Sequence, residues 1–124
     1  MSRVRCCYVV AKNVERSVEF YQALLGIPLA FRDGSKWVQF RTESGNFAVS
    51  GAEEAATPQS NSVIVFEVGD LVSAERTILK EGGLILNRRD MNEHGRTVTF
   101  VDPDGNVGQV FFKAGERSVM EQRD

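Results

Sequence analysis

The feature that most constrains this chain is an internal repeat of two local signals in the same order. A helix N-cap residue stands at Asn13 and again at Asp70, a spacing of 70 − 13 = 57 residues. A Phe-x4-Gly-Asn turn follows each helix, with its glycine at Gly45 and at Gly105, a spacing of 105 − 45 = 60 residues. Each copy alone would leave an apolar sheet face uncovered. The repeat therefore predicts two similar units that bury these faces by pairing with one another or with a second chain.

Each copy begins with a strand, continues with a helix and ends with a hairpin. In the first copy, Val14, Val18, Tyr21 and Leu25 form one helical stripe, and Gly26 suits the residue after the helix. The stripe of the second helix comprises Leu71, Ala74 and Ile78. The predicted strands are 5–10, 37–41, 47–50, 62–68, 84–86, 96–101 and 107–113, and the polar residues 87–95 are predicted to form a loop.

The length of 124 residues is typical of one domain. We expect this domain to span residues 1–114, with modules at about 4–50 and 62–113. A polar linker at 51–61 would separate the modules, and a charged tail at 115–124 would follow them.

Composition and charge exclude several classes of partner. Fifteen Lys and Arg residues against 17 Asp and Glu residues give a net charge of −2, which offers no electrostatic basis for binding nucleic acid or an anionic membrane. The apolar run at 6–11 is too short for a membrane span or a signal sequence. The only cysteines, Cys6 and Cys7, are adjacent, so a disulfide between them would be strained. We expect a cytoplasmic protein with reduced thiols.

The alternation of side chains along a strand predicts which residues face away from the helices. If Cys7 and Val9 cover the first helix, the opposite, concave face carries Cys6, Tyr8 and Val10. The same reasoning gives the concave face of the second copy as Val63, Val65, Glu67, Gln109 and Phe111. A shift of one residue would invert every one of these assignments.

Two segments resemble one protein superfamily. Residues 13–26 (NVERSVEFYQALLG) are similar to the first helix of the vicinal oxygen chelate superfamily, and residues 98–106 (VTFVDPDGN) resemble its second hairpin. That superfamily includes glyoxalase I, extradiol dioxygenases, fosfomycin-resistance enzymes and bleomycin-resistance proteins. The resemblance covers about residues 4–112. It implies an α+β fold in which two βαβββ modules form a partly open mixed-sheet barrel, usually in a homodimer, but one fold hosts many activities.

The resemblance also implies where metal-dependent members place their ligands, which are typically His and Glu. These positions fall on Cys6, Val49, Val63 and Gln109. Valine cannot coordinate a metal, Gln109 is a weak neutral donor, and one cysteine does not make a site. The only histidine, His94, lies in a predicted loop. We therefore expect no metal and no cofactor.

Three functions remain open. The first is a metal-free protein that binds a small organic molecule in a concave cleft near a dimer interface, with drug sequestration by bleomycin-resistance proteins as the nearest analogy. Its candidate ligand-binding residues combine aromatic, amide and carboxylate groups: Tyr8, Trp37, Gln39, Glu67, Gln109 and Phe111. No residue is assigned a catalytic role. The second is a metal-dependent lyase, isomerase or dioxygenase, which requires other ligand positions. The third is an interaction protein without a ligand site.

Each candidate also has a purely structural interpretation. Tyr8 and Trp37 can equally belong to the core, and Glu67 can simply mark a strand end in water. Gln109 can be a buried amide that neighbouring groups satisfy. Structural roles are favoured for the remaining polar and thiol groups, which are Cys6, Arg88, Arg89, His94, Asp102 and Asp104.

Overall fold

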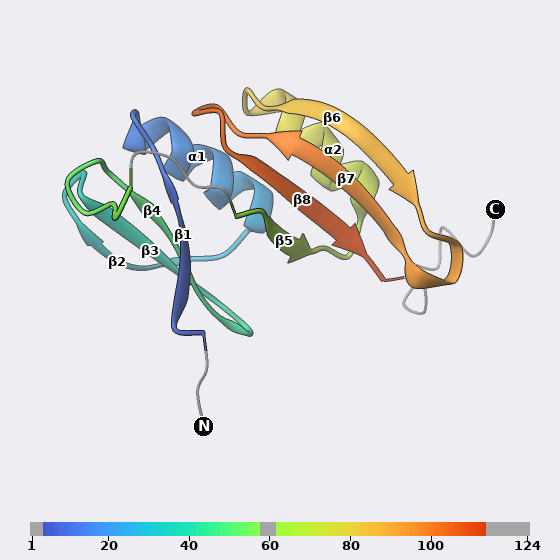
Figure 1. Cartoon of the computed structure of the whole chain (residues 1–124), viewed down its shortest axis with the longest axis horizontal. Coiled ribbons are helices and arrows are strands. Elements are labelled where there is room, and N and C mark those ends of the chain that lie inside the picture. Colours follow the sequence, from blue (N-terminus) through green and yellow to red (C-terminus); the bar gives the residue numbers. More distant parts are fainter. Residues whose placement is uncertain (1–3, 58–61, 114–124) are drawn as a thin grey trace. The chain divides into compact units, whose positions relative to one another are not determined.

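The computed structural model describes residues 4–57 and 62–113 (Figure 1). The chain divides into two compact units, Met1–Ser62 and Val63–Asp124. The predicted tail at 115–124 and part of the predicted linker, 58–61, lie outside the described residues. The expectation of a single domain stays a prediction.

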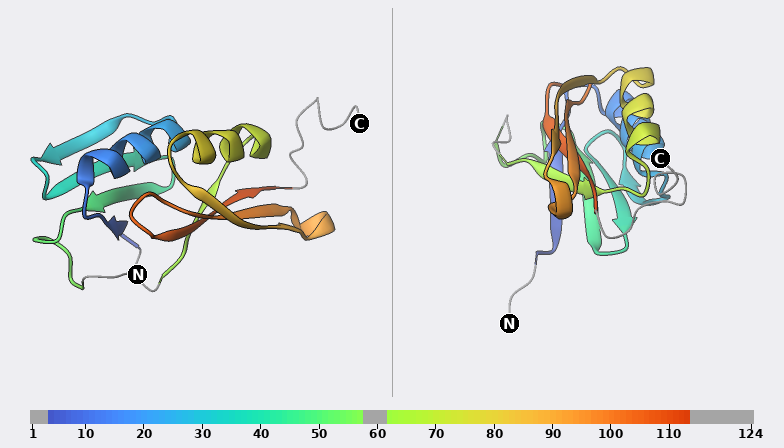
Figure 2. Two further views of the ribbon diagram at one scale, coloured as in Figure 1. Left: turned by 90° about the horizontal axis from the view of Figure 1, so that it is seen from above. Right: turned by 90° about the vertical axis from the view of Figure 1, so that its right-hand side faces the viewer.

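The first unit is a four-stranded mixed sheet with one helix on one face (Figures 1 and 2). Its strands follow the order β1-β4-β3-β2, in which β1 and β4 are parallel and the other pairs are antiparallel. Its elements are β1 (Cys6–Val10), α1 (Val14–Leu25), β2 (Leu29–Asp33), β3 (Trp37–Thr42) and β4 (Gly45–Ser50).

The second unit repeats this topology. Its strands follow the order β5-β8-β7-β6, again with one parallel pair, β5 and β8. Its elements are β5 (Ile64–Glu67), α2 (Leu71–Lys80), β6 (Leu84–Asp90), a short 3-10 helix η1 (Asn92–His94), β7 (Arg96–Val101) and β8 (Val107–Phe112). The predicted α+β class with two βαβββ modules is confirmed. Each described sheet is open, with its first strand at one edge.

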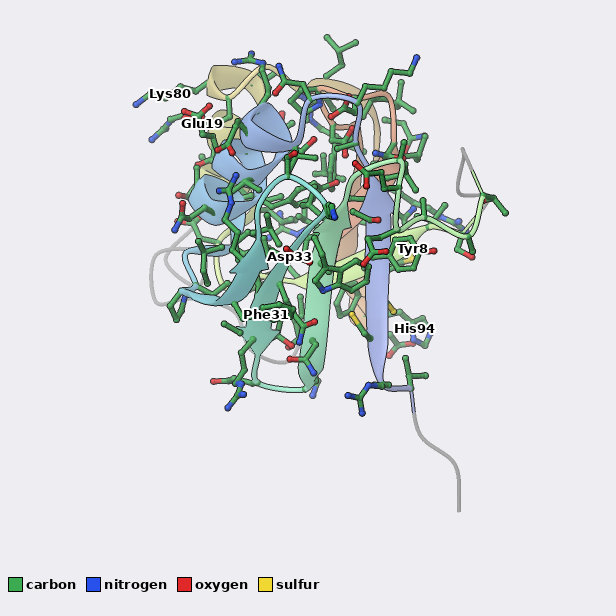
Figure 3. The ribbon with its side chains drawn as sticks, turned by 90° about the vertical axis from the view of Figure 1, so that its left-hand side faces the viewer. Tyr8, Glu19, Phe31, Asp33, Lys80 and His94 are labelled. Carbon is green, nitrogen blue, oxygen red and sulfur yellow. The ribbon has the colours of Figure 1, made fainter. Side chains whose placement is uncertain are left out.

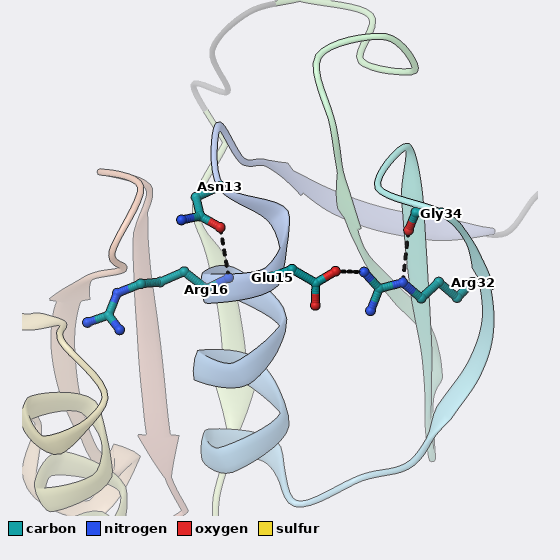
Figure 4. Close-up of polar contacts among 5 residues, drawn as sticks. All are labelled: Asn13, Glu15, Arg16, Arg32 and Gly34. Carbon is teal, nitrogen blue, oxygen red and sulfur yellow. Dashed lines mark hydrogen bonds and ion pairs between the residues drawn. The ribbon is translucent and has the colours of Figure 1, made fainter.

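Both helices begin where the sequence predicts. The side-chain oxygen of Asn13 accepts a hydrogen bond from the Arg16 amide at 3.2 Å (Figure 4), and that of Asp70 accepts one from the Ser73 amide at 3.1 Å. These contacts satisfy backbone donors that have no partner inside a helix. Gly26 ends α1 in the left-handed region at φ 62°, which a glycine adopts without steric cost.

Each sheet buries an apolar face against its own helix. In the first unit Tyr21 of α1 packs edge-on against Phe47 at a ring distance of 4.8 Å, and Phe40 stacks on Phe47 at 6.0 Å. The core of the second unit is made in the same way by Ile78, Val98, Phe100, Val110 and Phe112. Burial of these side chains stabilises each unit by removing apolar surface from water.

Two strands differ from the sequence prediction. β2 was not predicted, because all of its residues are exposed and no apolar alternation marks it. β6 extends to Asp90, so the prediction of a loop from residue 87 is wrong for 87–90. Most of β6 is exposed as well, which explains why its polar second half resembles a loop in sequence.

Candidate functional site

The face of the first sheet that points away from α1 carries the predicted first-unit candidates. Tyr8 and Gln39 both lie beside Ala48 in the sheet register, and Trp37 lies beside Ser50. Val9, Val38 and Phe40, which alternate with these residues, are buried, whereas Cys7 is exposed. The predicted parity of β1 therefore agrees with the burial of Val9, but the prediction that Cys7 covers the first helix is wrong.

Tyr8, Trp37 and Gln39 form a connected cluster. The Tyr8 and Trp37 rings meet edge to face, with centroids 5.2 Å apart and an interplanar angle of 61°. The Trp37 indole N–H donates to Gln39 Oε1 at 2.9 Å, which fixes the plane of the indole. The Tyr8 hydroxyl accepts a hydrogen bond from the Ala56 amide at 2.9 Å. All three side chains are half-buried, so the cluster is ordered yet open to solvent.

In the second unit, Glu67, Gln109 and Phe111 share the face that points away from α2. Glu67 lies beside Phe111 in the register of β5 and β8, and Gln109 donates from Nε2 to the Thr99 hydroxyl at 3.0 Å. Glu67 is exposed, whereas Gln109 and Phe111 are half-buried. Three candidates thus lie in each unit, and one cleft that contains all six stays a prediction.

Val49, one of the ligand positions that the resemblance implies, does not lie on the open face of the first sheet. Val49 is fully buried and lies beside Val9 and Val38, so it faces α1. The neighbours on the opposite face are Ala48 and Ser50, and the Ser50 hydroxyl donates to the Gly51 carbonyl at 2.9 Å. Moving the implied ligand position by one residue, to Ala48 or Ser50, does not supply a metal ligand. Alanine has no side-chain donor atom, and a neutral hydroxyl is a poor donor.

The residues at the implied ligand positions do not fit a metal centre. Burial raises the pKa of the Cys6 thiol, the neighbouring Cys7 raises it further, and Arg5 partly opposes the rise. A thiol must lose its proton to bind a metal, so this environment works against coordination. Val63 has no donor atom, and the Gln109 amide binds Thr99. Among residues 4–57 and 62–113, no three His, Cys, Asp or Glu side chains lie close enough together to hold an ion.

A hollow of about 330 Å³ in the first unit was not predicted. Two aromatic and two acidic side chains line it: Phe31, Asp33, Trp37 and Glu54. Phe31 and Asp33 extend from β2, and Tyr8 from β1 (Figure 3). Sequence patterns could not find this hollow, because β2 has no apolar period and Glu54 lies in the segment predicted to be a linker.

A second hollow, of about 500 Å³, lies at the start of α1. Residues 11–15, Ser35 and 51–53 line it. It contains no aromatic side chain, and its two glutamates, Glu15 and Glu53, already pair with Arg32 and Lys36.

Three of the remaining polar candidates are Asp102, His94 and Arg88, and only Arg88 differs from its prediction. Asp102 is 3% exposed, and its carboxylate accepts hydrogen bonds from the amides of Asp104 and Asn106, as a turn requires. His94 is exposed in η1. Arg88 was predicted to be a solvated loop residue, but it lies on β6 and pairs with Glu75 of α2. No helix of the described residues is long and apolar enough to cross a membrane.

Solved structures with the same fold include functionally different proteins. A glyoxalase-related enzyme from Fulvimarina pelagi matches 91% of this chain and 89% of its own length, with 19% identity and a TM-score of 0.75. A glyoxalase/bleomycin resistance protein from Albidiferax ferrireducens T118 matches 90% and 99%, with 20% identity and a TM-score of 0.75. A fosfomycin resistance protein from Mesorhizobium loti matches 99% and 98%, with 16% identity and a TM-score of 0.68.

At these identities the structural matches establish the fold alone. No curated protein matches the sequence. The family model of the Glyoxalase/Bleomycin resistance protein/Dioxygenase superfamily matches residues 3–110, which is most of the chain. Together with the two βαβββ modules, this match shows that the chain belongs to the Glyoxalase/Bleomycin resistance protein/Dioxygenase superfamily.

Proposed function

We propose that this protein binds a small, flat organic molecule without a metal ion, and that it acts as a homodimer with its ligand in a concave cleft near the dimer interface. Sequestration of a drug or another toxic molecule is the role that fits best. The observation that carries this proposal is the half-buried cluster of Tyr8, Trp37 and Gln39 on the open face of the first sheet.

The chemistry of this cluster suits a flat ligand. Aromatic rings offer large contact areas with few rotatable bonds, and offset or edge-on stacking adds to the energy of burial. The bond between Trp37 and Gln39 holds the indole in one orientation, so little conformational entropy is lost on binding. The amide of Gln39 and the hydroxyl of Tyr8 add polar groups that can orient the ligand.

The second sheet supplies further groups for the same role. Gln109 and Phe111 are half-buried beside the exposed Glu67, which gives one amide, one ring and one carboxylate on a single face. We propose that these three residues also bind ligand. A metal-dependent enzyme of this superfamily is the second candidate, and the side chains at the implied ligand positions argue against it.

Trp37 makes the proposal directly testable, because it is the only tryptophan in the chain. Its indole N–H gives a single NMR signal that reports on the cluster. We would titrate the amide, carboxylate and amidinium derivatives of benzene and naphthalene, which are neutral, anionic and cationic flat probes. We expect at least one series to shift this signal in a saturable way, and Trp37→Leu to abolish its binding as measured by calorimetry.

The matched control is Leu79→Ala, which removes an exposed apolar side chain from α2 (Leu79 is 54% exposed) and should leave binding unchanged. If no probe of any charge perturbs the Trp37 signal, the proposed function is wrong. Sedimentation equilibrium tests the homodimer independently, and a monomer at all concentrations would contradict that part of the proposal.

A further inference from the structure

We propose that the hollow beside Trp37 is a subsite for an organic cation, such as an amidinium, a guanidinium or a quaternary ammonium group. This inference rests on the proposed function, because the hollow and the cluster share Trp37, and it names the chemical class of the ligand. The hollow measures about 330 Å³ and lies within the first unit.

The walls of the hollow are the side chains that attract organic cations. Phe31 is 52% exposed, although it is a large apolar residue on a strand. It lies beside Gln39 in the register of β2 and β3, next to the pair formed by Asp33 and Trp37. A cation above the face of a tryptophan or phenylalanine ring is attracted by the negative potential of the ring, and tryptophan attracts most strongly.

The acidic groups of the hollow are available for such a ligand. Asp33 lies directly beside Trp37 in the register of β2 and β3, and Glu54 comes from the segment after β4. Neither carboxylate takes part in an ion pair within residues 4–57 and 62–113. Two carboxylates and two rings around one hollow complement a positive charge carried on an apolar frame.

The neighbouring cations are engaged elsewhere. Arg32 precedes Asp33, but its guanidinium pairs with Glu15 and donates to the Gly34 carbonyl (Figure 4). Lys36 lies 3.8 Å from Glu53, measured from Nζ to Oε2. The chain thus provides other partners for the two basic side chains closest in sequence to Asp33, and leaves the acidic side of the hollow uncompensated.

The segment that carries Glu54 is held in place by several contacts. The Gly51 amide donates to the Lys36 carbonyl at 2.8 Å, the Glu54 amide donates to the Gly51 carbonyl at 3.3 Å, and the Ala56 amide donates to Tyr8. A Cβ atom at Gly51 would lie 2.4 Å from the Ser35 carbonyl oxygen, so this close approach requires glycine. Glu54 therefore belongs to a folded segment that positions it beside Trp37.

A matched set of probes tests the charge preference. Benzamidinium and benzamide have the same shape and differ in charge, and benzoate has the opposite charge. We expect benzamidinium to bind the intact chain about tenfold more tightly than benzamide, and benzoate more weakly than either. The Trp37 indole signal should shift in each case where binding occurs. The preference should also decrease at high salt, because exposed charges are screened.

Variants that keep the shape of the hollow and remove its charge identify the source of the preference. In Asp33→Asn/Glu54→Gln the preference for benzamidinium should fall from about tenfold to about threefold, which is the part that the two rings supply, while benzamide binding is unchanged. Glu43→Gln, an exposed carboxylate in the β3–β4 turn, is the matched control and should keep the full preference. Thermal melting of each variant verifies that the fold is intact.

Two results would contradict the inference in distinguishable ways. If benzamide and benzamidinium shift the Trp37 signal with equal affinity, or if the double variant keeps the preference, the cation subsite is wrong and the proposed function stands. If none of the three probes, nor their naphthalene counterparts, perturbs Trp37, the proposed function fails together with the subsite.

Discussion

At the scale of single residues, Gly108 shows how closely β8 approaches the core of the second unit. A Cβ atom at this position would lie 2.6 Å from Cζ of Phe100, whose ring is fully buried. We expect Gly108→Ala to lower the free energy of unfolding by about 1–3 kcal/mol, because a buried ring has no room to move. Urea denaturation measures this loss.

Gly69 provides the matched control for this substitution. A Cβ atom at Gly69 would have no atom within 4 Å. Gly69→Ala should therefore leave stability unchanged or raise it by about 0.4–1 kcal/mol, since alanine reduces the freedom of the unfolded chain. Equal losses in the two variants would show that the contact with Phe100 is not the cause.

The thiol of Cys6 gives a prediction about pH. Burial, and then the neighbouring Cys7, raise the pKa of Cys6 above its ordinary value, although Arg5 opposes the rise. The folded state therefore holds this proton more tightly than the unfolded state. The resulting stability is complete below the ordinary thiol pKa and is lost as the pH rises through the folded value.

Alkylation of Cys6 by iodoacetamide measures the shift, because only the thiolate reacts. In Cys7→Ser, which isolates Cys6, the rate should reach half its maximum at a higher pH in the folded chain than in urea. The shift persists in this variant because burial is its main cause. A midpoint that is equal in both states, or lower when folded, would contradict the assignment.

At the scale of elements, the start of α2 depends on one side chain. Asp70 Oδ1 accepts a hydrogen bond from the Ser73 amide. We expect Asp70→Ala to lower the free energy of unfolding by about 1 kcal/mol, and Asp70→Ser, which keeps an acceptor, to lower it much less. Thermal or urea unfolding of the two variants separates the capping bond from other effects of the substitution.

Elements with one buried face could be predicted from the sequence, and exposed ones could not. Tyr21 and Ile78 are buried on helix stripes whose spacing is visible in the sequence, and both helix starts agree with their caps. β2 and the second half of β6 have no buried face, so no hydrophobic period marks them. Their pairing depends on hydrogen bonds to β3 and β7, which a sequence pattern does not encode.

The same limit applies to the candidate site. Tyr8, Trp37 and Gln39 were found because strand alternation places them on one face. Asp33 and Glu54 were missed, because their proximity depends on an exposed strand and on a folded segment that resembles a linker. Val49, an implied ligand position, is buried on the helix side, which the resemblance did not reveal because it gave no face for this residue.

At the scale of the whole molecule, the internal repeat is the most informative feature of the sequence. The two units have the same strand order and the same parallel pairing of their first and last strands. The spacing of the caps and turns could predict this equivalence because duplicated units keep their local signals. What the repeat does not determine is the chemistry on the open faces, where the two copies differ.

The donor chemistry of both units predicts the response to metals. We expect excess Mn²⁺ or Ni²⁺ to change the melting temperature by less than about 1 °C, since an ion bound to the folded state alone would raise it by several degrees. Differential scanning calorimetry with and without chelator measures this response. A stoichiometric ion accompanied by a clear rise in melting temperature would instead favour the metal-dependent enzyme.

The hydrogen bond from the Ala56 amide to the Tyr8 hydroxyl joins the segment after β4 to the first strand. The Ala56 amide is held by the Tyr8 phenol and not by a backbone carbonyl. A ligand that binds the Tyr8 hydroxyl would therefore compete with the Ala56 amide for it. A ligand on the open face would then weaken the Ala56 hydrogen bond, and the Ala56 amide would take up deuterium faster. Tyr8→Phe should reproduce that loosening in the absence of any ligand.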